Sequence, residues 1–388
     1  MLYYKRKTFL KQILEKPHRG NIRDVMIVAL PMLLSMSFDT LMTFADRLFL
    51  AKLSPELMNA ALAGGSAQVM VMTFFNGLIA YSTAQVAQNF GAKQFHNCSK
   101  SCTQAAILAL VCTPLVLLVK PFVYWLFSLS EVSSVQLEAQ TVYFNTLLYG
   151  AVLILFRQVF VSFFSGIGKT KIVMVAAFIG LVVNVTMNYL LIFGVSINGT
   201  QIIPSLGITG AALATLFARI VECILLLTIG YKKKLPPAGN PKELFGFGQN
   251  LFSKYLRIGI PVIINETLWS FGITLQNRVY ARAGTDVIAA FNISNTVAQI
   301  SWVFLMGIGN AAAVLIGKKI GEGNKSLAYK YSHRVTILAP IVASIVALLL
   351  IPLSKILHIF FDGLTSGKYP PRSIIVFCII LGFYHKID

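Results

Sequence analysis

VMIVALPMLLSMSFDTLMTFADRLFLA, residues 25–51, is an apolar stretch long enough to cross a membrane, and a weaker copy of it lies 230 positions later, where Pro31 recurs as Pro261. The same offset relates further positions in and beside other apolar stretches. The matched pairs are Pro31 and Pro261, Ala51 and Ala281, Ala60 and Ala290, Gly77 and Gly307, Gly91 and Gly321, and Lys100 and Lys330. Internal repeats of membrane helices are typical of secondary transporters, so the repeat predicts two tandem helix bundles.

The composition is that of an integral membrane protein. Hydrophobic residues make up 56% of the 388 positions, charged residues make up 12%, and the mean hydropathy is +0.73. Runs of spanning character include residues 25–51, 105–119, 142–164, 172–193, 208–231 and 335–352. Because no strand-like alternation appears, the backbone must satisfy its hydrogen bonds within helices. We predict an all-α polytopic protein with about nine complete spans and part of a tenth.

The net charge of +19 follows the membrane topology. Basic residues cluster before the first predicted span and after the second, fourth, sixth and eighth, whereas residues 130–138 and 196–206 carry none. By the positive-inside rule, this alternation places the N-terminus in the cytoplasm of a multi-pass protein of the cytoplasmic membrane. The positive charge therefore does not predict a nucleic-acid partner.

The repeat also predicts the domain organisation. Residues 1–24 form a cytoplasmic segment, 25–231 an N-lobe of six helices, 232–254 a cytoplasmic linker, and 255–388 a second repeat, the C-lobe. Subtracting the offset of 230 from the last residue gives Gln158, inside the fourth span of the N-lobe. The C-lobe is therefore expected to be incomplete, with about four helices, as in a C-terminally truncated product. The two repeats are parallel, and we expect a substrate route between them.

Two acids lie in the first span. Asp39 and Asp46 are seven positions apart, which places them about 20° apart on one stripe of a helix. A carboxylate in the hydrocarbon region is costly unless it faces a cavity, a partner or a cation, so both are candidate sites for a cation or substrate. The alternative for Asp46 is an anchor at the membrane interface, paired with the neighbouring Arg47.

Three further polar residues lie inside predicted spans. Asn184 and Asn188 have i, i+4 spacing and share a helix face, where they can bind a cation or a protonated carboxyl, or join helices by hydrogen bonds. Glu266 is the only acid of the seventh span and has no basic residue within a turn. It is a candidate protonatable or cation-binding group, or a residue near a helix end that reaches water.

The sequence predicts no enzyme and no cofactor. The five histidines are isolated, the five cysteines lack zinc-ligand spacing, and no nucleophile elbow is present. The segment Gly166–Thr170 ends like a phosphate-binding loop but has Phe163 where that motif needs its first glycine. We therefore predict no metal site, and the only coupling species would be a proton or a sodium ion.

Several segments resemble the multidrug and toxic compound extrusion (MATE) family of the MOP flippase superfamily. They are ALPMLLSMSFDTLMTFADRLFLAKL, GIGKTKIVMVAAFIGLVVNVTMNYLLIFG, GITGAALATLFARIVE, PVIINETLWSFGITLQNRVYARAGTDVIAAFNIS and GIGNAAAVLIGKKIGEGN, within residues 25–388. The resemblance implies a two-lobe helix bundle. It implies an antiporter that exports organic, often cationic, compounds by alternating access, driven by a proton or sodium gradient.

The resemblance also assigns site residues. Asp46 matches the first-span aspartate of the family's N-lobe cation site, Asn184 and Asn188 match its fifth-span pair, and Thr215 resembles its sixth-span threonine. The second position of that pair is an aspartate in some members. Glu266 resembles the seventh-span glutamate, whereas residues 374–383 offer no counterpart of the tenth-span aspartate that some members use.

Two other functions stay open at this stage. One is a lipid-linked saccharide flippase of the same superfamily, for which Arg157 and Arg219 are the main cationic side chains available inside the spans. The other is an inactive truncated product. For the exporter, the expected partners are a small-molecule substrate and the lipid bilayer, and the expected state is a monomer.

Overall fold

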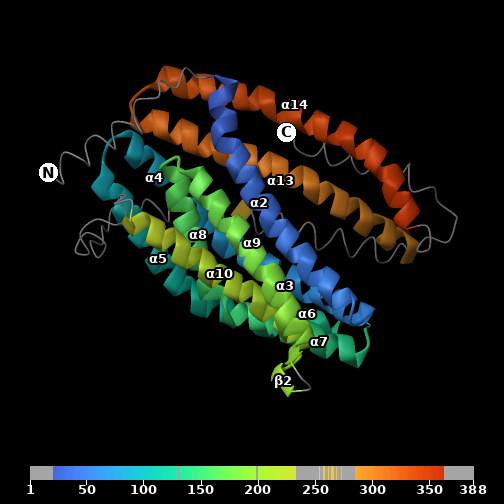
Figure 1. The fold of residues 1–388 in the computed structure, drawn as a ribbon. Coiled ribbons are helices and arrows are strands. Elements are labelled where there is room, and N and C mark those ends of the chain that lie inside the picture. The colour runs from blue at the N-terminus through green and yellow to red at the C-terminus, as the bar shows by residue number, and fades with distance from the viewer. Residues whose placement is uncertain are drawn as a thin grey trace.

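The computed structural model describes residues 21–129, 132–197, 200–232 and 285–361, with isolated residues between 253 and 272, and these are almost entirely helical (Figure 1). The helices are α2 (Ile22–Ala51), α3 (Pro55–Ala80), α4 (Ser82–Gly91), α5 (Phe95–Leu118), α6 (Lys120–Ser128), α7 (Ser134–Tyr149), α8 (Ala151–Gly166), α9 (Thr170–Phe193), α10 (Gly207–Lys232), α13 (Thr285–Gly321) and α14 (Lys325–Phe361). Six helices of the described residues are long and apolar enough to cross a membrane, or seven if the bent pair α7 and α8 forms one span. The predicted all-α polytopic fold is confirmed. The predicted seventh span, which carries Glu266, is described only at isolated residues, and residues 374–383 lie outside the described residues.

The fourth span is longer than predicted and is bent. Its first helix begins at Ser134 and not at 142, because the Ser133 side chain caps it by accepting a hydrogen bond from the backbone N–H of Gln136 at 3.2 Å. The two helices α7 and α8 meet at Gly150 with an angle of 50° between them. A side chain at Gly150 would collide with Leu216 of α10, so glycine lets α10 approach the bend.

The connection between α9 and α10 contains a short hairpin where the sequence predicted only a loop. Strands β1 (Val195–Ile197) and β2 (Thr200–Ile203) pair in antiparallel fashion at the end of the bundle (Figure 1). Gly194 precedes the hairpin with a positive φ of 75°, a conformation that glycine adopts without strain.

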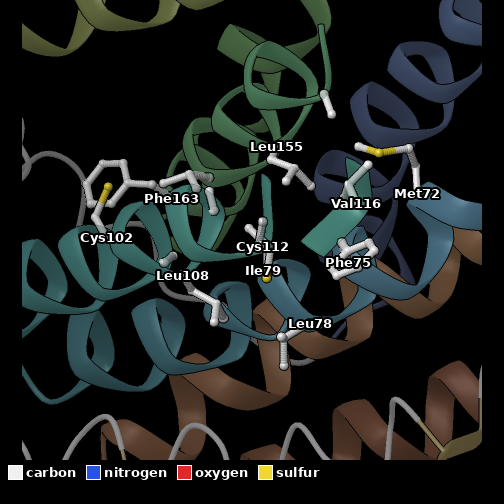
Figure 2. Close-up of a cluster of buried hydrophobic side chains, with 14 of the residues drawn as sticks. Met72, Phe75, Leu78, Ile79, Cys102, Leu108, Cys112, Val116, Leu155 and Phe163 are labelled. Carbon is white, nitrogen blue, oxygen red and sulfur yellow. The ribbon is translucent and has the colours of Figure 1, made fainter. Parts of the chain in front are cut away.

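The largest apolar cluster joins α3, α5 and α8 (Figure 2). Phe75 and Ile79 of α3 face Leu108 and Cys112 of α5, and Leu155 of α8 closes the cluster. Cys98, Cys102, Cys112 and Cys223 are all buried free thiols. Cys378 lies outside the described residues.

Two further packing relations position the site. Helix α9 packs against both α2 and α10, and α13 packs against α2, α4 and α14 (Figure 1). Where α4 meets α13, a Cβ on Gly91 would collide with the carbonyl oxygen of Lys318, and a Cβ on Gly321 would collide with that of Gln88. We call these four residues the α4–α13 seam. The two contacts are related by the 230-residue offset of the repeat, so the two halves of the chain meet here in a symmetric way.

Candidate functional site

The Asp46 carboxylate lies inside the bundle and accepts four hydrogen bonds. Its side chain is 2% exposed. The amide nitrogens of Asn188 and Asn184 donate to Oδ1 at 2.6 and 3.0 Å. The hydroxyls of Thr215 and Tyr143 donate to Oδ2 at 2.8 and 3.2 Å. We call these five residues the Asp46 site.

Four elements supply the Asp46 site. Asp46 comes from α2, Tyr143 from α7, both asparagines from α9 and Thr215 from α10. The i, i+4 spacing on α9 places the two amides one above the other, and Asn188 Nδ2 also donates to Asn184 Oδ1 at 3.1 Å. Asn184 Nδ2 also lies 3.2 Å from Thr215 Oγ1. The predicted residues Asp46, Asn184, Asn188 and Thr215 are therefore brought together.

The burial of Asp46 contradicts the alternative of an anchor at the membrane interface. Such an anchor would expose its carboxylate to water, whereas this carboxylate is enclosed and hydrogen-bonded to four uncharged groups. A buried carboxylate with neutral donors carries a charge that a proton or a bound cation would compensate.

One atom of the Asp46 site is left unsatisfied. Asn188 Oδ1 is buried and has no hydrogen-bond partner in the described part of the chain. A buried carbonyl oxygen without a partner is costly, so it is available to a proton on a neighbouring carboxyl or to a cation. Together with the oxygens of Asp46, Thr215 and Tyr143, it offers the oxygen-rich surroundings that hard cations bind.

Asp39 lies on the same stripe of α2 but in different surroundings. Arg157 Nη2 binds its Oδ1 and Oδ2 at 3.1 and 2.9 Å, and Arg219 Nη1 binds its Oδ1 at 2.6 Å. Both arginines also bind Glu222, Arg157 through Nε at 2.5 Å and Arg219 through Nη1 at 2.8 Å. We call Asp39, Arg157, Arg219 and Glu222 the charge quartet. Asp39 thus already has two cationic partners from the protein, whereas Asp46 forms no salt bridge within the described part of the chain.

The sequence interpretation missed Tyr143 and Glu222, and considered Arg157 and Arg219 only as phosphate ligands. The available signal for Glu222 was an acid inside an apolar span, three residues after an arginine. For Tyr143 the sequence offered no comparable signal, because a tyrosine in a membrane helix is most often a packing or interface residue. Glu266, the predicted C-lobe residue, lies outside the described residues.

The sequence matches a family model and relatives that are named as multidrug resistance proteins. The MatE family model matches residues 31–190 and 261–365. The chain is 26% identical over 340 residues to a probable multidrug resistance protein NorM of Pasteurella multocida, covering 86% of this chain and 71% of the relative. It is 26% identical over 326 residues to the multidrug resistance protein MdtK of Pectobacterium atrosepticum, covering 80% and 67%.

Solved structures share the fold. A MATE protein in complex with MaD3S superposes with a TM-score of 0.77 at 21% identity, over 93% of this chain and 80% of that one. An outward-facing multidrug resistance MATE transporter of the MOP superfamily gives a TM-score of 0.74 at 21% identity, over 92% and 77%. The family model covers more than half of the sequence, and the fold agrees with it. This chain therefore belongs to the multidrug and toxic compound extrusion (MATE) family of multi-pass membrane transporters.

Proposed function

We propose that this protein is a cation-coupled antiporter that exports organic, chiefly cationic, compounds across the cytoplasmic membrane by alternating access. The observation that carries the proposal is Asp46, a fully enclosed carboxylate whose four hydrogen-bond donors are all uncharged. An intramembrane carboxylate without an ionic partner is the group that an incoming proton or sodium ion neutralises.

The Asp46 site supports either coupling ion. A proton on Asp46 would donate to an amide oxygen once the Asn188 or Asn184 amide rotates, and Asn188 Oδ1 already lacks a partner. A sodium ion would be bound by the same rotated amide oxygens together with the Asp46 carboxylate and the Thr215 hydroxyl. In either case the amide orientations change when the ion arrives, because they now donate to the charged carboxylate.

Coupling follows from this change in hydrogen bonding. An ion can drive a conformational change only through its different affinity for the two conformations. The donors to Asp46 come from α7, α9 and α10, so neutralising the carboxylate weakens the contacts of three elements with α2 at once. This is the step that we assign to the transition between the two conformations.

The substrate class rests on the relatives, which are described as multidrug resistance proteins. One structural observation counts against the saccharide flippase. Arg157 and Arg219 are both engaged with Asp39 and Glu222, which leaves neither guanidinium free as a dedicated pyrophosphate ligand.

The test is efflux of ethidium, a cationic dye, from dye-loaded right-side-out membrane vesicles on which inward proton or sodium gradients are imposed. Asp46→Asn keeps the size of the side chain and removes its charge, so we expect gradient-driven efflux to fall to the level of vesicles without the protein. The matched control is Glu56→Gln, because Glu56 is an exposed acid in the first turn of α3. Efflux by Asp46→Asn at the rate of the control would contradict the proposal.

A further inference from the structure

Two of the helices that build the Asp46 site, α2 and α10, also carry residues of the charge quartet, two turns away. On α2, Asp39 precedes Asp46 by seven residues, and on α10, Glu222 follows Thr215 by seven residues. Seven residues make about two turns and return to nearly the same face of a helix. The Asp46 site and the charge quartet are therefore two polar layers of the same helix interface.

The bent pair α7 and α8 contributes one residue to each layer. Tyr143 lies seven residues before Gly150 and donates to Asp46, whereas Arg157 lies seven residues after Gly150 and binds Asp39 and Glu222. The bend at Gly150 therefore lies between the two layers, and its angle of 50° determines where Tyr143 meets α2.

Helix α9 contacts both polar layers. Asn184 and Asn188 bind Asp46, and Gly180, one turn earlier, leaves the space that Glu222 occupies. A Cβ at Gly180 would lie 2.5 Å from Glu222 Oε1 and 2.8 Å from its Cγ. The Glu222 side chain, which is 1% exposed, is thus enclosed between α9 and the two arginines.

We propose that Arg157 is a positioning residue for the Asp46 site. Its guanidinium binds α2 and α10 at once, through both Asp39 oxygens and one Glu222 oxygen, and so fixes the position and rotation of α8. With α8 fixed, the bend at Gly150 holds α7 so that the Tyr143 hydroxyl reaches Asp46. This inference rests on the proposed function, because it assigns Arg157 a part in ion coupling at Asp46.

The charges of the quartet explain why α8 is held in one position against α2 and α10. Two carboxylates and two guanidinium groups cancel, whereas removal of any one leaves a buried charge without its partner. Apolar side chains would hold the same helices together but would allow them to slide, because apolar contacts have no preferred direction. The planar guanidinium fork fixes a single register of α8 against its neighbours.

The test compares Arg157→Gln, Tyr143→Phe and the double variant in proteoliposomes, using only folded, monodisperse protein. Ethidium efflux is measured against external sodium at fixed pH and against pH at fixed sodium. Each single variant should lower the coupling-ion concentration for half-maximal efflux about fivefold, the effect of losing one hydrogen bond, because the Tyr143 hydroxyl stabilises the charged form of Asp46 and opposes its neutralisation. The double variant should shift it no further than either single, because both act on one contact. The ethidium concentration for half-maximal efflux should stay unchanged.

Lys319→Gln is the matched control, because Lys319 of α13 forms an ion pair with Glu322 away from both layers and should not shift the ion dependence. If Arg157→Gln yields no folded protein, Arg157→Lys replaces it, since lysine keeps the charge but loses the fork. Unchanged ion dependence in the folded arginine variant, or shifts that multiply in the double variant, would overturn the positioning role. An active Asp46→Asn would instead remove the proposed function itself.

Discussion

The polar layers of the N-lobe and the α4–α13 seam hold helices together in opposite ways. In the layers, long side chains from α2, α8, α9 and α10 meet in hydrogen bonds and ion pairs. In the seam, glycine removes the side chains, so that the backbone of α4 touches the backbone of α13. Both arrangements lie inside the helix bundle. Only the polar layers contain groups whose hydrogen bonds would change when a proton or cation binds.

The comparison teaches which property a substitution should change. A contact made by titratable and hydrogen-bonding groups depends on what is bound, so its loss alters ion dependence. A contact made by shape alone depends only on the space available, so its loss alters stability. Four Gly→Ala substitutions separate the two, because each adds the same methyl group against a different neighbour. Gly309→Ala on α13 is their common control, since no neighbouring atom lies within 4 Å of its Cβ position.

The largest effect is expected at the seam. In Gly321→Ala, the new methyl group would collide with the Gln88 carbonyl oxygen, and a backbone atom cannot rotate away. We expect the free energy of unfolding to fall by about 3 kcal/mol, the upper end for overpacking. The measurement is the apparent melting temperature in detergent micelles. Among the molecules that remain folded, the ion dependence of efflux should match the unsubstituted protein.

Gly91→Ala tests the symmetry of the seam. Its Cβ would collide with the Lys318 carbonyl oxygen, so its loss of stability should equal that of Gly321→Ala. A melting temperature like that of Gly309→Ala, for either variant, would show that the helices do not approach each other so closely.

A middle effect is expected at Gly180, where the neighbour is a charged side chain. In Gly180→Ala, the methyl group would displace Glu222 from its place against α9 and disturb its bonds to Arg157 and Arg219. We expect a loss of about 2 kcal/mol in the free energy of unfolding. Unlike the seam variants, this one should also lower the coupling-ion concentration for half-maximal efflux, because it weakens the placement of the Tyr143 donor to the charged Asp46. If the ion dependence stays unchanged while stability falls, the quartet acts on stability alone.

These differences explain how much could be predicted from the sequence. The periodicity of single helices identified Asn184 and Asn188 as neighbours, the cost of a carboxylate inside a membrane span identified Asp46 as a candidate cation site, and the family resemblance added Thr215. The partners of Asp39 come from helices 118 and 180 positions away, and the pattern within one helix carries no information on which face of another helix it meets. The apolar spans were predictable because burial in lipid demands them, whereas the bend at Gly150 depends on how Leu216 packs.

The smallest effect is expected at Gly150, where the neighbour is a flexible side chain. In Gly150→Ala, the methyl group would collide with the Cδ atoms of Leu216, whose χ angles can change to make room. We expect a loss of about 1 kcal/mol in the free energy of unfolding.

Shortening the Leu216 side chain should restore the bend in Gly150→Ala. In the double variant Gly150→Ala with Leu216→Ala, the collision is absent, so the added methyl group should cost less than it does beside Leu216. The measurement is a double-mutant cycle of apparent melting temperatures that includes Leu216→Ala alone, because that variant loses apolar contact on its own account.

The ion dependence of Gly150→Ala shows whether the bend affects the Asp46 site. If the bend transmits the position of Arg157 to Tyr143, the coupling-ion concentration for half-maximal efflux should fall in Gly150→Ala and return in the double variant. An additive cycle with no change in ion dependence would mean that Gly150 provides only space for Leu216, and that the two polar layers are independent of the angle between α7 and α8.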